Sequence, residues 1–354
     1  MTGPSLRANM SSGKVVGVAV LFWLVIISVL HATFNLGIFD PGKPRGGTPF
    51  RVGFIPVTCH LTCPVTDFIN KQLSGKSGFE PVRFQGFPEL KEAFISGYLP
   101  ATFILAPLAM RMREDGVPLK IVYLGHRDGT AMVVHKDSQI YQIEDLKGKK
   151  IAVPNRFSNQ KLLVVKALKD RGISVDQVTI VEMPPPDMPA ALFSKSVDAI
   201  TSGEPFMGQA ELDGYGRVLY QTKDVWPNFI SCVLAVRDDA IRDHRATVEK
   251  LVQGIAKSGQ WLDKTMEHRM EAADFVAENY YNQNPRLLRF VLSKPPDRVK
   301  YTNLALRKND FLEIEALAKE TGILKGNVTF EDYADPSFVP EAGAIEPYAW
   351  DYKK

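Results

Sequence analysis

Hydrophobic positions along this chain fall into short runs separated by turns, and the pattern predicts alternating strands and helices. The stretches "RVGFIP" (51–56) and "KKIAVP" (149–154) fit apolar strands that end at a proline. "PELKEAFISG" (88–97) and "PDMPAALFSK" (186–195) fit helices, because proline suits the first helical turn. Strands that alternate with helices indicate parallel sheets covered by helices, so the sequence predicts an α/β fold.

The predicted elements repeat along the chain. Two related lobes would explain why identical residues recur at an offset of 98 in matching structural context. Segments 120–138 and 228–239 would carry the chain between these lobes, which would form a clamshell with a cleft. The six identical pairs are Pro56 and Pro154, Pro88 and Pro186, Ala93 and Ala191, Ser96 and Ser194, Ala101 and Ala199, and Pro107 and Pro205.

The N-terminal segment differs from the rest in having a long apolar run. Residues 15–39 contain no Asp, Glu, Lys or Arg, and Arg7 and Lys14 precede them. About 20 helical residues cross a hydrocarbon layer of about 30 Å. We therefore expect a transmembrane signal anchor at 15–39, with a cleaved signal peptide as the alternative.

These observations predict a full domain plan. The expected parts are a tail at 1–14, the anchor at 15–39, a linker at 40–49, lobe 1 at 50–135 plus 229–330, lobe 2 at 136–228, and a C-terminal tail at 331–354.

Composition and charge narrow the class of partner. The chain has 354 residues, enough for about two domains, with a formal net charge of +3 and three cysteines. So small a charge, without a long basic run, argues against nucleic acid as a partner.

Candidate binding residues follow the ends of the predicted strands. Ligands of open parallel sheets bind beyond the carboxyl ends of the strands, where helix N-termini also favour anions. The loop after the first strand and its counterpart in lobe 2 would face each other across the cleft. A third loop, "GHRDGT", offers an arginine suited to an oxyanion, or is simply a hairpin turn at Asp128-Gly129. The candidates are Thr58, Cys59, His60, Pro107, His126, Arg127, Thr130, Asn155, Arg156, Ser158, Asn159 and Glu204.

The first of these loops, "TCHLTCP" (58–64), allows several interpretations. A zinc site would need a fourth ligand such as His126, and the spacing matches no zinc pattern, so we expect no metal. A catalytic thiol would need a base and an oxyanion hole. A Cys59–Cys63 disulfide is compatible with the wall of a binding pocket, which is the interpretation we favour. Pro64 at the first helical position would leave Cys63 in the loop.

Several motifs together carry a family resemblance. "VGFIP", "FPELKEAFISG" with "APLAM", "DLKGKKIAVP", "VDAITSGEP" and "FEDYADPSFV" cover most of residues 50–340. With them the chain resembles the solute-binding proteins of bacterial ABC transporters for nitrate, sulfonate, taurine and bicarbonate, a family that also contains thiamine-pyrimidine-precursor binders.

The resemblance implies a two-lobed periplasmic-binding fold of type II, with two crossovers, and a function in transport. The protein would capture a small anion and deliver it to an ABC permease with its ATPase. It would need no cofactor or catalysis and would lie at the bacterial inner membrane, with its soluble part on the periplasmic side. The alternatives are a thiamine-pyrimidine-precursor binding protein, a pyrimidine-synthase-like enzyme, and a ligand sensor or adaptor.

Overall fold

The computed structural model describes residues 12–30, 49–340 and 345–352, and it divides the chain into two compact units, Met1–Pro49 and Phe50–Lys354. In the first unit the described element is helix α1 (Ser12–Leu30). Among the described residues, none of the helices combines the length and apolar character required for a membrane span. The expected anchor at 15–39 continues into residues 31–39, which lie outside the described residues, so the anchor stays a prediction.

One five-stranded sheet forms the first lobe of the second unit. Its order is β2-β1-β3-β11-β4, in which β1 pairs in parallel with β2 and β3, while β11 runs antiparallel to β3 and β4. The central strand β3 is apolar apart from one threonine and is buried throughout, as expected for a strand covered on both faces. The strands are β1 (Arg51–Phe54), β2 (Glu80–Arg83), β3 (Ala101–Leu105), β4 (Leu119–Leu124) and β11 (Cys232–Arg237).

The second lobe repeats this topology. Its sheet has the order β10-β6-β9-β7-β8, with β7 parallel to β8 and β9 and with β6 antiparallel to its neighbours. When the second sheet is read from its β8 edge, its strand order and strand directions match those of the first sheet read from β2. This match supports the internal repeat. The strands are β6 (Thr130–His135), β7 (Lys150–Val153), β8 (Thr179–Glu182), β9 (Ala199–Gly203) and β10 (Gly216–Gln221).

The chain crosses between the lobes twice. It leaves the first sheet after β4, passes through β5 (Arg127–Asp128), which pairs with β12 (Val299–Lys300), and enters the second sheet at β6. The expected lobe boundary at residue 135 is therefore wrong, because β6 pairs with β9 and β10. The chain returns through β11. The first crossing thus supplies β6, which is antiparallel to β9 in the second lobe, and the return crossing supplies β11, which is antiparallel to β3 in the first lobe.

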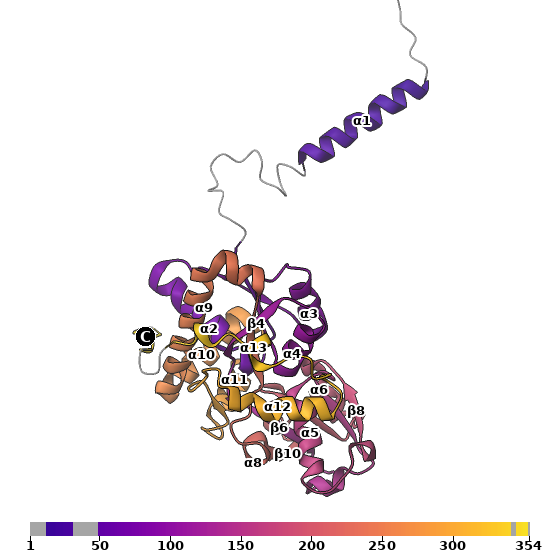
Figure 1. Ribbon diagram of the computed structural model, residues 1–354, viewed down its shortest axis with the longest axis vertical. Helices are drawn as coiled ribbons and strands as arrows, with labels where there is room; N and C mark the ends of the chain where they lie inside the picture. The colour runs from indigo at the N-terminus through magenta and orange to yellow at the C-terminus, as the bar shows by residue number, and fades with distance from the viewer. Residues whose placement is uncertain (1–11, 31–48, 341–344, 353–354) are drawn as a thin grey trace, which may run out of the picture. The chain divides into compact units, whose positions relative to one another are not determined.

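Helices cover both sheets, with the long α9 in the upper part of the second unit in Figure 1 and α5, α6 and α8 in the lower part. Helix α2 begins at Thr62, two residues before Pro64, so Cys63 is helical and the prediction that it lies in a loop is wrong. The helices of this unit are α2 (Thr62–Ser74), α3 (Phe87–Ile95), α4 (Ala106–Glu114), α5 (Asn159–Lys169), α6 (Met188–Phe193), α7 (Phe206–Leu212), α8 (Thr222–Val225), α9 (Asp238–Lys264), α10 (Met266–Val276), α11 (Pro285–Ser293), α12 (Lys308–Glu320) and α13 (Phe330–Tyr333).

Shorter helical segments complete the described chain: η2 (Thr58–His60), η3 (Ile143–Leu146), η4 (Val175–Gln177), η5 (Pro185–Asp187), η6 (Ala277–Tyr281) and η7 (Pro336–Phe338). The large aromatic side chains of Phe54, Trp261 and Tyr301 are fully buried against α2, α9 and α10, and this packing holds the loop after β1 in place.

Candidate functional site

A small cavity lies where strand ends of both lobes meet, and we call it the interlobe cavity. Leu105 and Gly203 end β3 and β9, one strand from each sheet, and both line the cavity. Its volume is about 10 Å³, close to what one water molecule needs. The lobes are therefore nearly closed. The lining residues are Val57, Cys59, Phe87, Leu105, Pro154, Gln160, Ser202, Gly203, Ser231 and Cys232.

Neutral polar groups from lobe 2 and the return crossing face this cavity. The Gln160 amide, in the first turn of α5, donates to Thr130 Oγ1 at 3.3 Å and to Ser231 Oγ at 3.2 Å. Its side-chain carbonyl oxygen is buried and has no hydrogen-bond partner among the described residues. Buried polar atoms normally have partners, so this oxygen is available to a ligand or to water.

The loop after β1 joins the two lobes through its backbone. The Thr58 N–H donates to the Glu204 carbonyl oxygen at 2.6 Å, and the Tyr301 hydroxyl donates to the Thr58 carbonyl oxygen at 3.0 Å. Thr58 Oγ1 lies 3.1 Å from His126 Nε2. Burial lowers the pKa of His126, so this imidazole is neutral at neutral pH.

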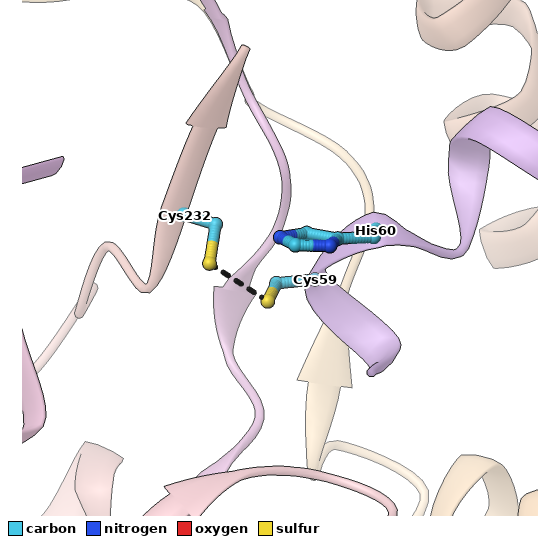
Figure 2. A group of neighbouring side chains, drawn as sticks. All are labelled: Cys59, His60 and Cys232. Carbon is cyan, nitrogen blue, oxygen red and sulfur yellow. Dashed lines mark hydrogen bonds between the residues drawn. The ribbon is translucent and has the colours of Figure 1, made fainter. Parts of the chain in front are cut away.

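Two thiols meet at the wall of the interlobe cavity. Figure 2 shows Cys59, from η2, pointing toward Cys232, the first residue of β11. Their sulfur atoms share a hydrogen bond of 3.0 Å. Burial favours the neutral Cys59 thiol, but the hydrogen bond with Cys232 and the neighbouring His60 outweigh it and lower the pKa of Cys59. Burial and the bond to Cys59 raise the pKa of Cys232.

The His60 ring is fixed in one orientation beside these thiols. The Ile55 backbone N–H donates to His60 Nδ1 at 2.8 Å, so the neutral ring carries its proton on Nε2. That Nε2 atom is buried and has no hydrogen-bond partner in the described part of the chain. His60, Cys59 and Cys232 lie close enough to be considered as metal ligands, with their donor atoms within 4.8 Å of one another.

The structure contradicts the predicted Cys59–Cys63 disulfide. All three cysteines are free, and Cys59 faces Cys232 rather than Cys63. Cys63 lies in the first turn of α2, where burial and the nearby Asp67 carboxylate raise its pKa. Nearness in sequence therefore did not predict the partner of Cys59, because Cys63 belongs to α2 while the Cys59 side chain contacts Cys232.

The two arginines expected to hold an anion are engaged elsewhere. Arg127 is buried and forms an ion pair of 2.5 Å with Asp310, and it also donates to the carbonyl oxygens of Asn303 and Asn228. The Arg156 side chain is 68% exposed and pairs with Glu182 at 3.2 Å. Neither arginine lines the interlobe cavity.

Glu204 is held by an arginine that the sequence analysis missed. Its carboxylate accepts from Arg298 at 2.8 Å and from the Gly208 backbone N–H at 2.7 Å. Arg298 also donates to Glu211 at 2.8 Å. Burial raises the pKa of Glu204, and the Arg298 charge opposes that rise. Glu204 therefore neutralises a buried arginine.

The remaining predicted residues support local structure or bridge the lobes. Ser158 caps α5 by accepting from the Lys161 N–H at 3.0 Å, and the Asn155 side chain accepts from the Phe157 N–H at 2.8 Å. Pro107 is buried in the first turn of α4. The Asn159 amide donates to the Ile230 carbonyl oxygen, which ties α5 to the return crossing. Asp128 and Gly129 have positive φ angles of 62° and 64°, but the hairpin alternative is wrong, because β4 and β6 lie in different sheets and β5 pairs with β12.

Comparisons with known proteins agree with this architecture. The model of the NMT1-like family matches residues 44–277. The chain is 25% identical over 307 residues to a putative aliphatic sulfonates-binding protein of Escherichia coli, covering 85% of this chain and 90% of that one. It is 26% identical over 252 residues to the nitrate import ATP-binding protein NrtC of Synechocystis, covering 65% of this chain but only 37% of that longer protein.

A solved structure gives the same result for the fold. The ligand-binding component of an ABC-type import system from Staphylococcus aureus, solved with zinc bound, superimposes with a TM-score of 0.73. It is 25% identical in sequence, and the match covers 82% of this chain and 97% of that chain. The two-lobed α/β architecture is therefore that of the periplasmic binding proteins.

Proposed function

Because this chain belongs to the NMT1-like family, we propose that it is the solute-binding component of an ABC-type importer. In this proposal its two lobes close on a small anion and present it to a permease. The observation that carries the proposal is the interlobe cavity, which is lined by strand ends and helix starts of both lobes. Ligands of open α/β sheets bind at such positions.

The lining of the cavity favours a small oxyanion over a zwitterion. Ser202 and Ser231 offer hydroxyl donors, and the cavity lies beside the starts of α4 and α5, where free backbone N–H groups favour negative charge. The residues that line the cavity include no carboxylate to pair with an ammonium group, and Glu204 is already paired with Arg298. We therefore rank nitrate and bicarbonate ahead of taurine and the longer sulfonates.

Delivery to a permease and an ATPase is part of the same proposal. It is supported by the similarity to NrtC, whose name marks it as the ATP-binding protein of a nitrate importer. Tethering through residues 15–39, with the soluble part on the export side of the inner membrane, also stays a proposal. Membrane fractionation of the full chain, before and after an alkaline carbonate wash, tests it: recovery of the intact chain in the washed supernatant contradicts tethering.

A thermal-shift panel tests the binding function. The full chain in mild detergent is melted with sodium salts of nitrate, bicarbonate, ethanesulfonate and taurine, and with a pyrimidine, against sodium chloride at equal ionic strength. A ligand at a hundred times its dissociation constant stabilises the folded protein by about 2.7 kcal/mol, which corresponds to a rise of several degrees. We expect that rise for nitrate or bicarbonate. The absence of a rise with every solute would contradict the proposal.

A further inference from the structure

The pair of thiols in the wall of the interlobe cavity has a chemistry that solute binding does not require. Cys59 and Cys232 come from segments 173 residues apart in sequence, yet their sulfur atoms lie 3.0 Å apart. Both residues are buried, with exposed fractions of 2% and 1%. We propose that Cys59 and Cys232 form a thiol–disulfide pair, which a disulfide oxidant converts into a covalent cross-link inside the cavity.

The geometry favours a disulfide over a shared metal ion. Two thiolates on a tetrahedral zinc ion lie about 3.8 Å apart, since each Zn–S bond is about 2.3 Å long. The observed 3.0 Å is shorter, and the sulfurs need to approach by only about 1 Å to reach a disulfide bond length of about 2.05 Å.

The third candidate metal ligand, His60, is also unsuited to a cation. Its Nδ1 atom accepts the Ile55 N–H, so its Nε2 atom carries a proton and cannot coordinate a metal without loss of that hydrogen bond. The unpaired Nε2–H group is instead free to donate to a thiolate, and His60 is among the groups that lower the pKa of Cys59. The Cys59–His60–Cys232 cluster therefore fits thiol chemistry better than metal binding.

The reaction is a two-step exchange in which the oxidant is a disulfide, RSSR. The Cys59 thiolate attacks one sulfur of RSSR, forms a mixed disulfide and releases one RS⁻. Cys232 then attacks Cys59 Sγ, the mixed-disulfide bond breaks, and the second RS⁻ leaves with the proton of Cys232. Two thiols lose two electrons in total, and one RSSR becomes two RSH molecules.

The cross-link would join the loop after β1 to the end of the return crossing. Cys232 directly follows Ile230 and Ser231, which are hydrogen-bonded to Asn159 and Gln160 of α5 in the other lobe. Because both sulfurs are buried in a nearly closed cavity, an oxidant reaches them only when the lobes open. We therefore expect a bound solute to slow oxidation at least tenfold, and this expectation rests on the proposed function.

Peptide mapping of the full chain tests the pair. The reduced protein in mild detergent is exposed to oxidised glutathione, blocked with N-ethylmaleimide and digested with trypsin without reductant. We expect a linked species made of residues 52–71 and 224–237, with a single thiol, Cys63, blocked. Since residues 52–71 contain both Cys59 and Cys63, the variant Cys63→Ser serves as the matched control and should give the same link. Cys59→Ser and Cys232→Ser should each abolish it.

Three outcomes would overturn the inference. These are blocking of all three thiols after prolonged exposure, a link confined to residues 52–71, and retention of one equivalent of zinc that protects Cys59 and Cys232 from both reagents. A link that forms while no solute shifts the melting temperature would leave the thiol pair intact and contradict the binding function. Solute binding without formation of the link would support the binding function and contradict the thiol pair.

Discussion

The backbone N–H of Thr58 in one lobe donates a hydrogen bond of 2.6 Å to the carbonyl oxygen of Glu204 in the other. This contact lies beside the interlobe cavity, whose lining includes the neighbours Cys59 and Gly203. The two lobes therefore touch through groups that no side-chain substitution removes. Solute selection is left to the side chains around the contact.

Gln160 is expected to contact the solute, whereas Arg156 is not. Replacement of Gln160 by alanine removes the amide that holds Thr130 Oγ1 and Ser231 Oγ at the cavity wall, together with a carbonyl oxygen that can accept from the hydroxyl of bicarbonate. Loss of one or two hydrogen bonds at about 0.5–1.5 kcal/mol each predicts affinity about three- to thirtyfold weaker for the anion identified in the panel. Arg156→Ala should change affinity less than about twofold, because that side chain is 68% exposed. Calorimetric titration measures both, and equal losses would contradict the placement of the site.

Arg298 is expected to be essential to stability. The exposed fractions of the Arg298 and Glu204 side chains are 2% and 0%, so Arg298→Met leaves a buried carboxylate without its countercharge. Such changes typically cost about 3–5 kcal/mol of unfolding free energy. The matched control is Arg289→Met, which breaks a partly exposed pair with Asp274 and should cost at most about 1 kcal/mol. Urea unfolding measures the two, and similar midpoints would contradict the prediction.

The alternation of apolar runs and proline-led helices was enough to predict the architecture. Strand and helix periodicity are local properties, so β1, β7 and the repeat that relates the two lobes could be recognised. The boundary at 135 was wrong because pairing of β6 with β9 and β10 is a long-range property. The fold was thus accessible from local pattern, while the distribution of strands between the sheets was not.

The partners within the site could not be predicted for the same reason. Arg298 lies 94 residues from Glu204, and Cys232 lies 173 residues from Cys59. Charge alone suggested Arg127 as an anion ligand, but its pairing with Asp310 follows from how α12 packs, which no motif records. A buried cysteine at the start of the strand of the return crossing was the one available signal for Cys232.

Gly125 is expected to tolerate no side chain. A Cβ atom at this position would lie 2.2 Å from the Cys59 carbonyl oxygen, which is backbone and cannot rotate away. We expect Gly125→Ala to displace the loop after β1 and to lower both stability and solute affinity, by about 1–3 kcal/mol in unfolding free energy. Gly203→Ala is the control, since its nearest contact would be Cys59 Sγ at an ordinary 3.8 Å. If the two variants have the same melting temperature, the close approach to the Cys59 carbonyl oxygen is not the reason for glycine at position 125.

The thiol pair predicts a stability that depends on oxidation. A bond between residues 173 apart would restrict the unfolded chain over a long loop, and a native disulfide typically contributes about 2–4 kcal/mol. The oxidised protein should therefore melt several degrees above the reduced one. Cys232→Ser should melt at the same temperature under both conditions, whereas Cys63→Ser should keep the difference. A difference that survives in Cys232→Ser would assign the effect to another group.

The pH dependence of alkylation separates Cys59 from Cys63 within one molecule. Burial favours the neutral Cys59 thiol, but the hydrogen bond with Cys232 and the neighbouring His60 outweigh it and lower the pKa of Cys59, so its thiolate forms at lower pH than that of Cys63. Burial and the Asp67 carboxylate raise the pKa of Cys63, so its thiolate fraction still rises about tenfold per pH unit between about pH 7 and pH 9. The ratio of Cys59 to Cys63 modification by iodoacetamide should therefore fall steeply as pH increases. Opening of the fold affects the absolute rates of alkylation of both thiols. The Cys63→Ser variant gives the rate for Cys59 without a contribution from Cys63, and Cys59→Ser gives the rate for Cys63 without a contribution from Cys59. A ratio independent of pH would show that the two thiols ionise alike and that Cys59 is not the attacking sulfur.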